Sequence, residues 1–172
     1  MFKLIAAVLM ILMLVSCGEK TVPLFTIDFQ EPFSIPAGLN TIETHTFIIQ
    51  DIPSLLESYK SNYNVLDEDI GSILPSRGRM NQVFSNINYD FIQSVSVWMV
   101  SNVDPLYRYE LYYLDFVPLN TGDEIKLLSG ISNLKELMQE GSFDLEIKLK
   151  FRTFPPNQTD NLLTFGLVAN AN

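Results

Sequence analysis

Alternating apolar and polar positions dominate this chain and predict β-strands. In the clearest case, 143–151, five apolar residues alternate with charged ones, so Ile147 should point into the core while Glu146 and Lys148 face water. Other segments rich in apolar, β-branched and aromatic residues predict further strands. These segments are 24–29, 41–50, 88–100, 107–117, 125–128 and 162–169.

Two short helices are predicted between the strands. Ser54-Leu55-Leu56-Glu57 has the pattern of a capping box, in which the serine and glutamate side chains satisfy each other's backbone amides. It predicts a helix over 54–63. The segment 133–140 gathers its apolar residues on one helical face, and Gly141 follows where a left-handed terminating residue is favoured. These apolar residues are Leu134, Leu137 and Met138.

Many strands, few helices and no β-α alternation predict a mainly β fold, an antiparallel β-sandwich with two short helices in its connections. We expect one such domain over 24–172, because a chain of this size suits a single core. Weak periodicity over 64–84 predicts a long loop. The pattern does not specify the strand order.

The start of the chain has the parts of a secretory signal: Lys3, an apolar run over 4–15, and a small residue, Ser16. The run is shorter than the roughly 20 residues that a membrane-spanning helix needs. The tetrapeptide Leu14-Val15-Ser16-Cys17 resembles the lipobox of bacterial lipoproteins. The resemblance implies that 1–16 is a cleaved signal peptide, and that 17–23 comprises a lipidated Cys17 and a short tether.

The same resemblance implies a destination in the cell envelope. Lipoproteins of this type are held in the membrane by acyl chains, and an aspartate after the cysteine retains them at the inner membrane. Here that position is Gly18, so an outer-membrane location is expected. Some bacteria send lipoproteins to the cell surface through an acidic cluster, which Gly18-Glu19-Lys20 matches poorly. The choice between periplasmic and surface leaflet stays open.

Charge and cysteine usage exclude several functions. The formal net charge is −9, and such a surface repels phosphate backbones, so we expect no nucleic-acid partner. Because the single cysteine, Cys17, would carry lipid, it supplies neither an internal disulfide nor a thiol nucleophile.

The sequence contains no recognised catalytic motif and no ordinary zinc site, and the one enzymatic alternative left open is a carboxylate-based one. The single histidine, His45, has no Gly-x-Ser-x-Gly elbow beside it and cannot assemble an ordinary zinc site. The run Asp67-Glu68-Asp69 offers oxygen ligands, but Gly71 and Gly78 stand where a calcium loop needs other residues. A solvated acidic turn is favoured, with calcium binding left open. We therefore expect no enzyme, cofactor or structural metal.

Two arginines in the predicted loop, Arg77 and Arg79, are separated by a single residue in the sequence. Arginine forks suit carboxylates and phosphates. In so acidic a chain the simplest interpretation is pairing with its own carboxylates, and the alternative is docking to an anionic partner.

An aromatic segment, 107–116, is the second candidate interface. Alternation assigns Tyr107, Tyr109, Leu111 and Tyr113 to one face, and Tyr112, Leu114 and Phe116 to the other. Neither face is plainly polar, so something must cover the second one. A helix of the chain itself could do so. The functional alternative is a surface for a partner protein or a sugar, where Tyr and Trp are favoured.

Together these features predict a non-enzymatic lipoprotein of the outer membrane that acts as an accessory or interaction subunit of an envelope complex. The alternative is a β-sandwich lipoprotein that binds a glycan or another small ligand. In that case Trp98 could join the tyrosines in stacking, although its apolar surroundings favour a place in the core.

Overall fold

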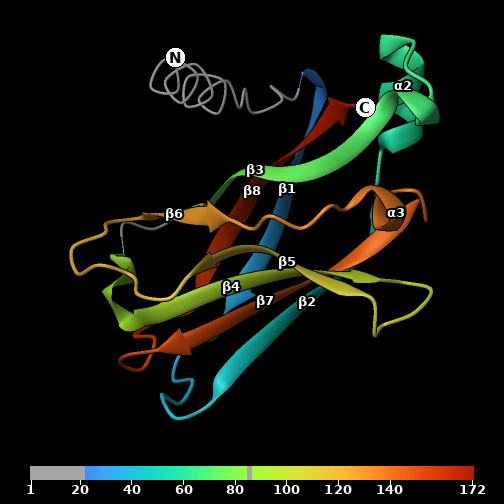
Figure 1. Cartoon of the computed structure of the whole chain (residues 1–172). Coiled ribbons are helices and arrows are strands. Elements are labelled where there is room, and N and C mark those ends of the chain that lie inside the picture. The colour runs from blue at the N-terminus through green and yellow to red at the C-terminus, as the bar shows by residue number, and fades with distance from the viewer. Residues whose placement is uncertain (1–21, 85–86) are drawn as a thin grey trace, which may run out of the picture.

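The computed structural model describes residues 22–84 and 87–172, and it is mainly antiparallel β-sheet (Figure 1). Cys17, the signal sequence and the tether before Val22 lie outside the described residues. No helix in the described part is long and apolar enough to cross a membrane. The strands are β1 (Pro23–Ile35), β2 (Thr44–Pro53), β3 (Ile70–Gln82), β4 (Ile92–Ser101), β5 (Arg108–Leu114), β6 (Glu124–Ser129), β7 (Ser142–Phe151) and β8 (Thr159–Ala171).

The strands follow the order β1-β8-β3-β6-β5-β4-β7-β2. Only two residue pairs join β5 to β6, Tyr112 with Ser129 and Tyr113 with Leu128, so the sheet divides there into two four-stranded layers. Their orders, β1-β8-β3-β6 and β2-β7-β4-β5, are those of a jelly roll, a double-sheet form of the β-sandwich. The outer strands β1 and β2 meet where the rings of Phe33 and Phe47 lie 5.8 Å apart. The predicted antiparallel sandwich is confirmed.

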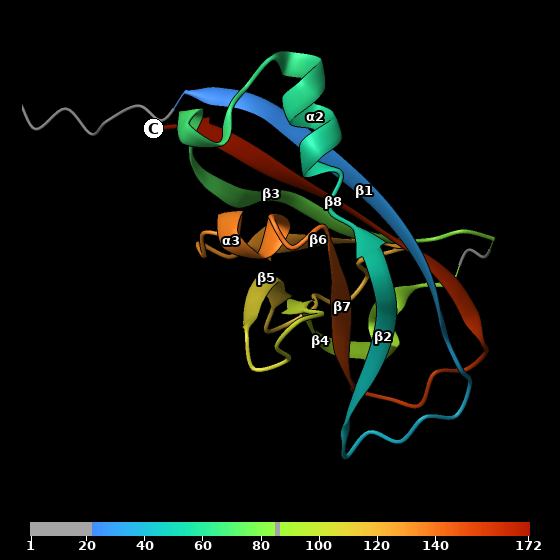
Figure 2. The same ribbon diagram turned by 90° about the vertical axis from the view of Figure 1, so that its right-hand side faces the viewer.

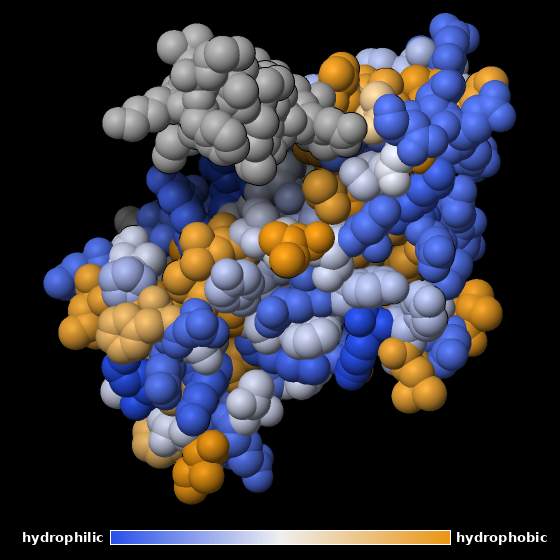
Figure 3. Space-filling view, in the orientation of Figure 1, coloured by the Kyte–Doolittle hydropathy of each residue, from blue (hydrophilic) through white to orange (hydrophobic). Residues whose placement is uncertain are grey.

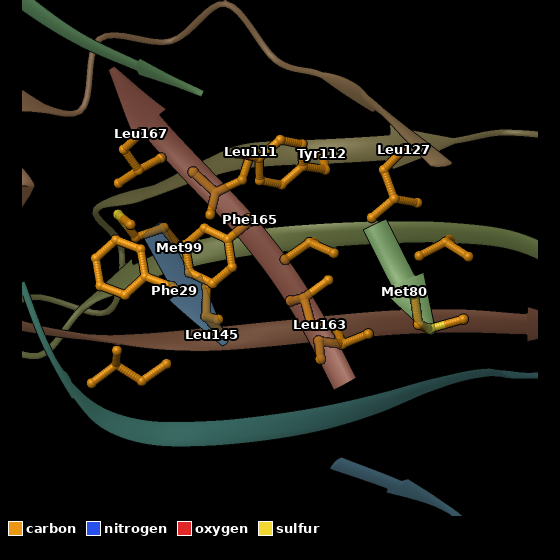
Figure 4. Packing of buried hydrophobic residues seen from close by; sticks show 14 of the residues in the cluster. Phe29, Met80, Met99, Leu111, Tyr112, Leu127, Leu145, Leu163, Phe165 and Leu167 are labelled. Carbon is orange, nitrogen blue, oxygen red and sulfur yellow. The ribbon is translucent and has the colours of Figure 1, made fainter. Parts of the chain in front are cut away.

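The strand with the strictest alternation forms as predicted. In β7 the five apolar side chains are buried and alternate with partly exposed ones, and Ile147 is fully buried. In the core, the Phe29 ring stacks on Phe165 of the same layer at 4.7 Å and meets Phe143 of the opposite layer edge-on at 5.6 Å. Figure 4 shows Phe29 of β1 and Phe165 of β8 packed close together, with Leu145 of β7 beside them.

The predicted loop over 64–84 is wrong, because β3 occupies most of it. Its alternation is hidden by two shifts of register against β8, one of which lies between Pro75 and Gly78. Proline lacks a backbone donor and usually argues against a strand inside a sheet. Here β6 pairs with β3 only from Gly78 onward, so Pro75 has a strand partner on one side only.

Both predicted helices form, each shorter than expected. The helix α2 (Leu56–Tyr63) begins without a side-chain cap, so the predicted capping box is wrong. Ser54 is buried, and Leu55 adopts a left-handed conformation before the first turn. The helix α3 (Lys135–Met138) buries the predicted apolar face, and Gly141 has the predicted positive φ, 90°. Two 3-10 turns, η1 (Asp67–Asp69) and η2 (Tyr89–Phe91), complete the elements.

A bulge in β5 turns two consecutive side chains inward. Val97 of β4 pairs with Tyr112, but Trp98 pairs with Glu110, so Leu111 is the extra residue. Leu111 and Tyr112 are both fully buried. Figure 4 shows them side by side next to Phe165 of the opposite layer.

Tyr112 ties the two layers together. Its hydroxyl donates to the backbone carbonyl oxygen of Gly166 in β8 at 2.7 Å, and burial raises its pKa well above the ordinary range, which keeps it protonated. The ring covers Gly78 of β3 so closely that a Cβ there would lie 2.6 Å from Cδ1 of Tyr112. Glycine at 78 is therefore required by the ring above it.

The connections gather at two ends of the molecule (Figures 1 and 2). One end carries α2, α3, the β4–β5 connection, the start of β1 and the end of β8. The other end carries the connections β1–β2, β3–β4, β5–β6 and β7–β8.

Substituting Gly78→Ala should lower the free energy of unfolding by about 1–3 kcal/mol, because the added methyl group overlaps the Tyr112 ring. Arg79→Ala is the matched control on the next residue, which is exposed, and should change it by about 0.5 kcal/mol or less. Urea titration measures both. Equal losses in the two variants would contradict this role for Gly78.

Candidate functional site

The structure separates the four tyrosines of the predicted interface. Tyr107 is exposed beyond the end of β4, and its ring meets Tyr109 edge-on at 5.9 Å. Burial raises the pKa of Tyr109, with further contributions from Tyr107 and from Glu136 of α3. Tyr112 lies in the core, and Tyr113 is half-buried opposite Ser96. The predicted faces are wrong beyond Leu111, because the bulge reverses the alternation there.

The two arginines lie on β3 and not in a loop. Arg77 Nη2 lies 3.0 Å from both carboxylate oxygens of Asp28 on β1. Arg79 Nη1 lies 3.6 Å from Glu124 Oε2 on β6. These contacts agree with pairing to the chain's own carboxylates and place both arginines on the outside of the β1-β8-β3-β6 layer.

The remaining candidates for chemistry have structural partners. His45 Nε2 lies 2.9 Å from the Asn40 carbonyl oxygen, and its ring packs on Phe151 at 5.3 Å. Asp67 is paired with Lys60 at 2.7 Å, and this hydrogen bond holds the Asp67 pKa below its usual value. Across residues 22–84 and 87–172, no group of three or more His, Cys, Asp or Glu is suited to hold a metal ion.

A charged ladder crosses the outside of the β2-β7-β4-β5 layer. Arg108 Nη2 donates to both oxygens of Glu146 at 3.1 and 3.0 Å, and Lys148 Nζ lies 3.1 Å from Glu146 Oε2. Burial opposes ionisation of Glu146, but the hydrogen bonds from Lys148 and Arg108 outweigh it and lower its pKa. The outward residues of β7 are thus less exposed than predicted.

Trp98 lies within this ladder and not in the core, which corrects the sequence-based expectation. It is half-buried, and its indole nitrogen donates to Ser96 Oγ at 3.2 Å. Lys148 Nζ lies 5.0 Å and Arg108 Cζ 6.0 Å from the ring centroid, which are cation-π distances. Because these cations already pack against the indole, stacking of a sugar on Trp98 would have to displace them.

A hollow of about 310 Å³ opens beside the ladder, over β2, β7 and the end of β4. Its polar lining includes Asp51, Asn102, Asp144 and Glu146, and Ile48 adds an exposed apolar wall. Asp51 has a positive φ of 57°, and its backbone amide donates to Asp144 Oδ1 at 2.9 Å. Asn102 Nδ2 donates to Asp51 Oδ1 at 3.2 Å, which ties the β4–β5 connection to the hollow.

That connection, residues 102–107, is here called the hairpin tip, and it carries exposed apolar side chains. Val103 is 79%, Leu106 88% and Tyr107 47% exposed. Figure 3 shows apolar atoms at the margin where the hairpin protrudes. Pro105 and Asn102 of the tip also line the hollow, so the two features are continuous.

Hydrogen bonds from Ser101 hold the tip in one conformation. Its Oγ accepts from the backbone amides of Val103 and Asp104, each at 3.0 Å, and donates to Glu140 Oε2 at 2.7 Å. Its backbone amide donates to the Tyr107 carbonyl at 2.9 Å, and Asp104 Oδ1 accepts from the Leu106 amide at 3.0 Å. The apolar side chains therefore project from an ordered loop.

Asp104-Pro105 is a turn signal in the sequence, but the apolar residues beside it were not recognised as part of a surface. Val103 and Leu106 beside this turn could have indicated an apolar surface, because turns on the surface of a protein are usually polar. The hollow left no such sign, since its residues come from three strands and a loop.

Comparisons with known proteins reveal no function. The sequence matches no family model and no curated protein. Among solved structures it is similar to turnip yellow mosaic virus at 100 K, with 15% identity, a TM-score of 0.28, and 86% of this chain and 93% of that chain covered. It is also similar to Desmodium yellow mottle tymovirus, with 11% identity, a TM-score of 0.26, and 91% of this chain and 95% of that chain covered. TM-scores this low carry no argument.

Glu146→Gln should lower the free energy of unfolding by about 1–2 kcal/mol at pH 7, because the carboxylate binds two cations. The folded-state pKa lies below the usual 4.5, so this stability is present above pH 4.5 and is lost as the pH falls through the folded-state value. In urea titrations at acidic pH, the free energies of unfolding of Glu146→Gln and of the parent protein should become equal. Glu136→Gln, at an exposed position, is the control. A difference between Glu146→Gln and the parent that persists unchanged at pH 2–3 would contradict the assignment.

Proposed function

We propose that this protein is a non-enzymatic lipoprotein of the bacterial envelope that acts as an interaction subunit. The observation that supports this most directly is the hairpin tip, an ordered loop that holds Val103, Leu106 and Tyr107 in solvent. Ordering exposed apolar groups before binding lowers the entropic cost of association. An aromatic ring and aliphatic groups beside Arg108 also have the composition of a protein interface.

Anchoring at the membrane follows from the lipobox at 14–17, with the outer membrane as the proposed site. Four residues separate Cys17 from Val22, so the distance between the two is at most about 18 Å. The end of the molecule where β1 begins also carries α2, α3 and the hairpin tip. A tether at that end would keep the tip near the bilayer, where a membrane-bound partner is within reach.

A glycan is the second candidate ligand, and the hollow is the observation that favours it. Asp51, Asn102 and Asp144 supply amide and carboxylate groups of the kind that bind sugar hydroxyls. The volume of about 310 Å³ is at the lower limit for ligand pockets. The cations packed on Trp98 leave this site without a free aromatic platform beside it.

Lipidation makes a direct prediction for the cysteine. Cys17→Ala should abolish incorporation of labelled palmitate and release the protein from the membrane fraction or leave it uncleaved, because no thiol remains to accept lipid. Membrane fractionation of labelled cells measures both outcomes. Label retained on the variant would contradict the proposal.

Purification from gently solubilised membranes tests the interaction function. We expect a partner at fixed stoichiometry, lost in Leu106→Glu while the melting temperature stays unchanged. Leu119→Glu, 60% exposed at the other end of the molecule, is the matched control and should retain it. A protein that purifies alone and changes its fluorescence with sugar would favour the glycan alternative.

A further inference from the structure

Two carboxylates in the hollow have no cation beside them among residues 22–84 and 87–172. Glu146 is neutralised by Arg108 and Lys148. Asp51 and Asp144, by contrast, form no ion pair with any residue of the described ranges. The Asp51 carboxylate accepts a hydrogen bond from the Asn102 side-chain amide, and the Asp144 carboxylate accepts one from the Asp51 backbone amide. These two carboxylates are therefore part of the unbalanced negative charge of a chain whose formal charge is −9.

An apolar partner that covered the tip would also remove these carboxylates from water. The tip and the hollow share Asn102 and Pro105, so a surface large enough to bury Val103 and Leu106 extends over the rim of the hollow. Burying an ionised carboxylate without a counter-charge is costly. The occupant must therefore bring positive charge together with its apolar groups.

We propose that the hairpin tip and the hollow form one docking site, and that its occupant is a partner protein segment with a lysine or arginine between apolar residues. The basic group enters the hollow against Asp51 and Asp144, and the apolar residues pack on Val103 and Leu106. This inference rests on the proposed interaction function and adds the chemistry of the partner. Charge complementarity favours a basic protein segment over anionic lipid headgroups, which the same carboxylates repel.

The experiment uses the full-length lipidated protein in intact cells, with the photo-crosslinking residue benzoylphenylalanine in place of Leu106. The test variant combines Asp51→Asn with Asp144→Asn. Asparagine tolerates the positive φ at position 51 and keeps a carbonyl acceptor at position 144, so the fold should be retained. The control combines Asp115→Asn with Asp123→Asn, two exposed carboxylates at the opposite end with the same change in net charge.

We expect a discrete protein adduct whose crosslinked peptide contains lysine or arginine near the site of attachment. Its yield should fall about tenfold or more in the test variant and stay unchanged in the control, with equal melting temperatures in all three proteins. An undiminished adduct in the test variant, or an adduct with lipid or glycan, would overturn the inference.

Failure of this inference is distinguishable from failure of the proposed function. If a partner co-purifies at fixed stoichiometry but no adduct forms at position 106, the docking site is wrong and the interaction function stands. If no partner co-purifies either, both are wrong.

Discussion

The structure depends on the way Tyr112 spans the two layers of the sandwich. Its ring lies over Gly78 and its hydroxyl bonds the Gly166 carbonyl, so one side chain of β5 fixes the position of β3 and β8. The bulge at Leu111 makes this possible, because it turns two neighbouring side chains into the core. Few backbone pairs join β5 to β6, so this side-chain contact is a main tie between the layers at that edge.

The same bulge arranges the outer surface. It leaves Arg108 and Glu110 outward before the bulge and Tyr113 outward after it, which brings Arg108 to Glu146 and closes the ladder around Trp98. The ladder occupies the outer side of the layer around Trp98, and the hollow and the hairpin tip lie next to it. The proposed function thus follows from the geometry of β5 and its neighbours, and not from the four tyrosines as a group.

The sequence pattern predicted most strands and the fold class, because strands such as β7 bury one face and leave the other partly exposed to solvent. It failed for β3, where register shifts around Pro75 hide the alternation. It also failed for the faces of β5, since a bulge is specified by cross-strand packing on Tyr112 and not by local pattern. For the candidate site, the predicted strands 88–100 and 107–117 imply a connection between them, whereas the hollow depends on strand order, which the pattern leaves open.

Backbone dynamics of the hairpin tip test the central claim that its apolar side chains are held ready for a partner. The measurement is ¹⁵N relaxation of the lipidated protein in nanodiscs, read at the amides of Val103 and Asp104, which donate to Ser101 Oγ. We expect order parameters of about 0.85, as in rigid backbone. Values below about 0.6, typical of flexible loops, would contradict it.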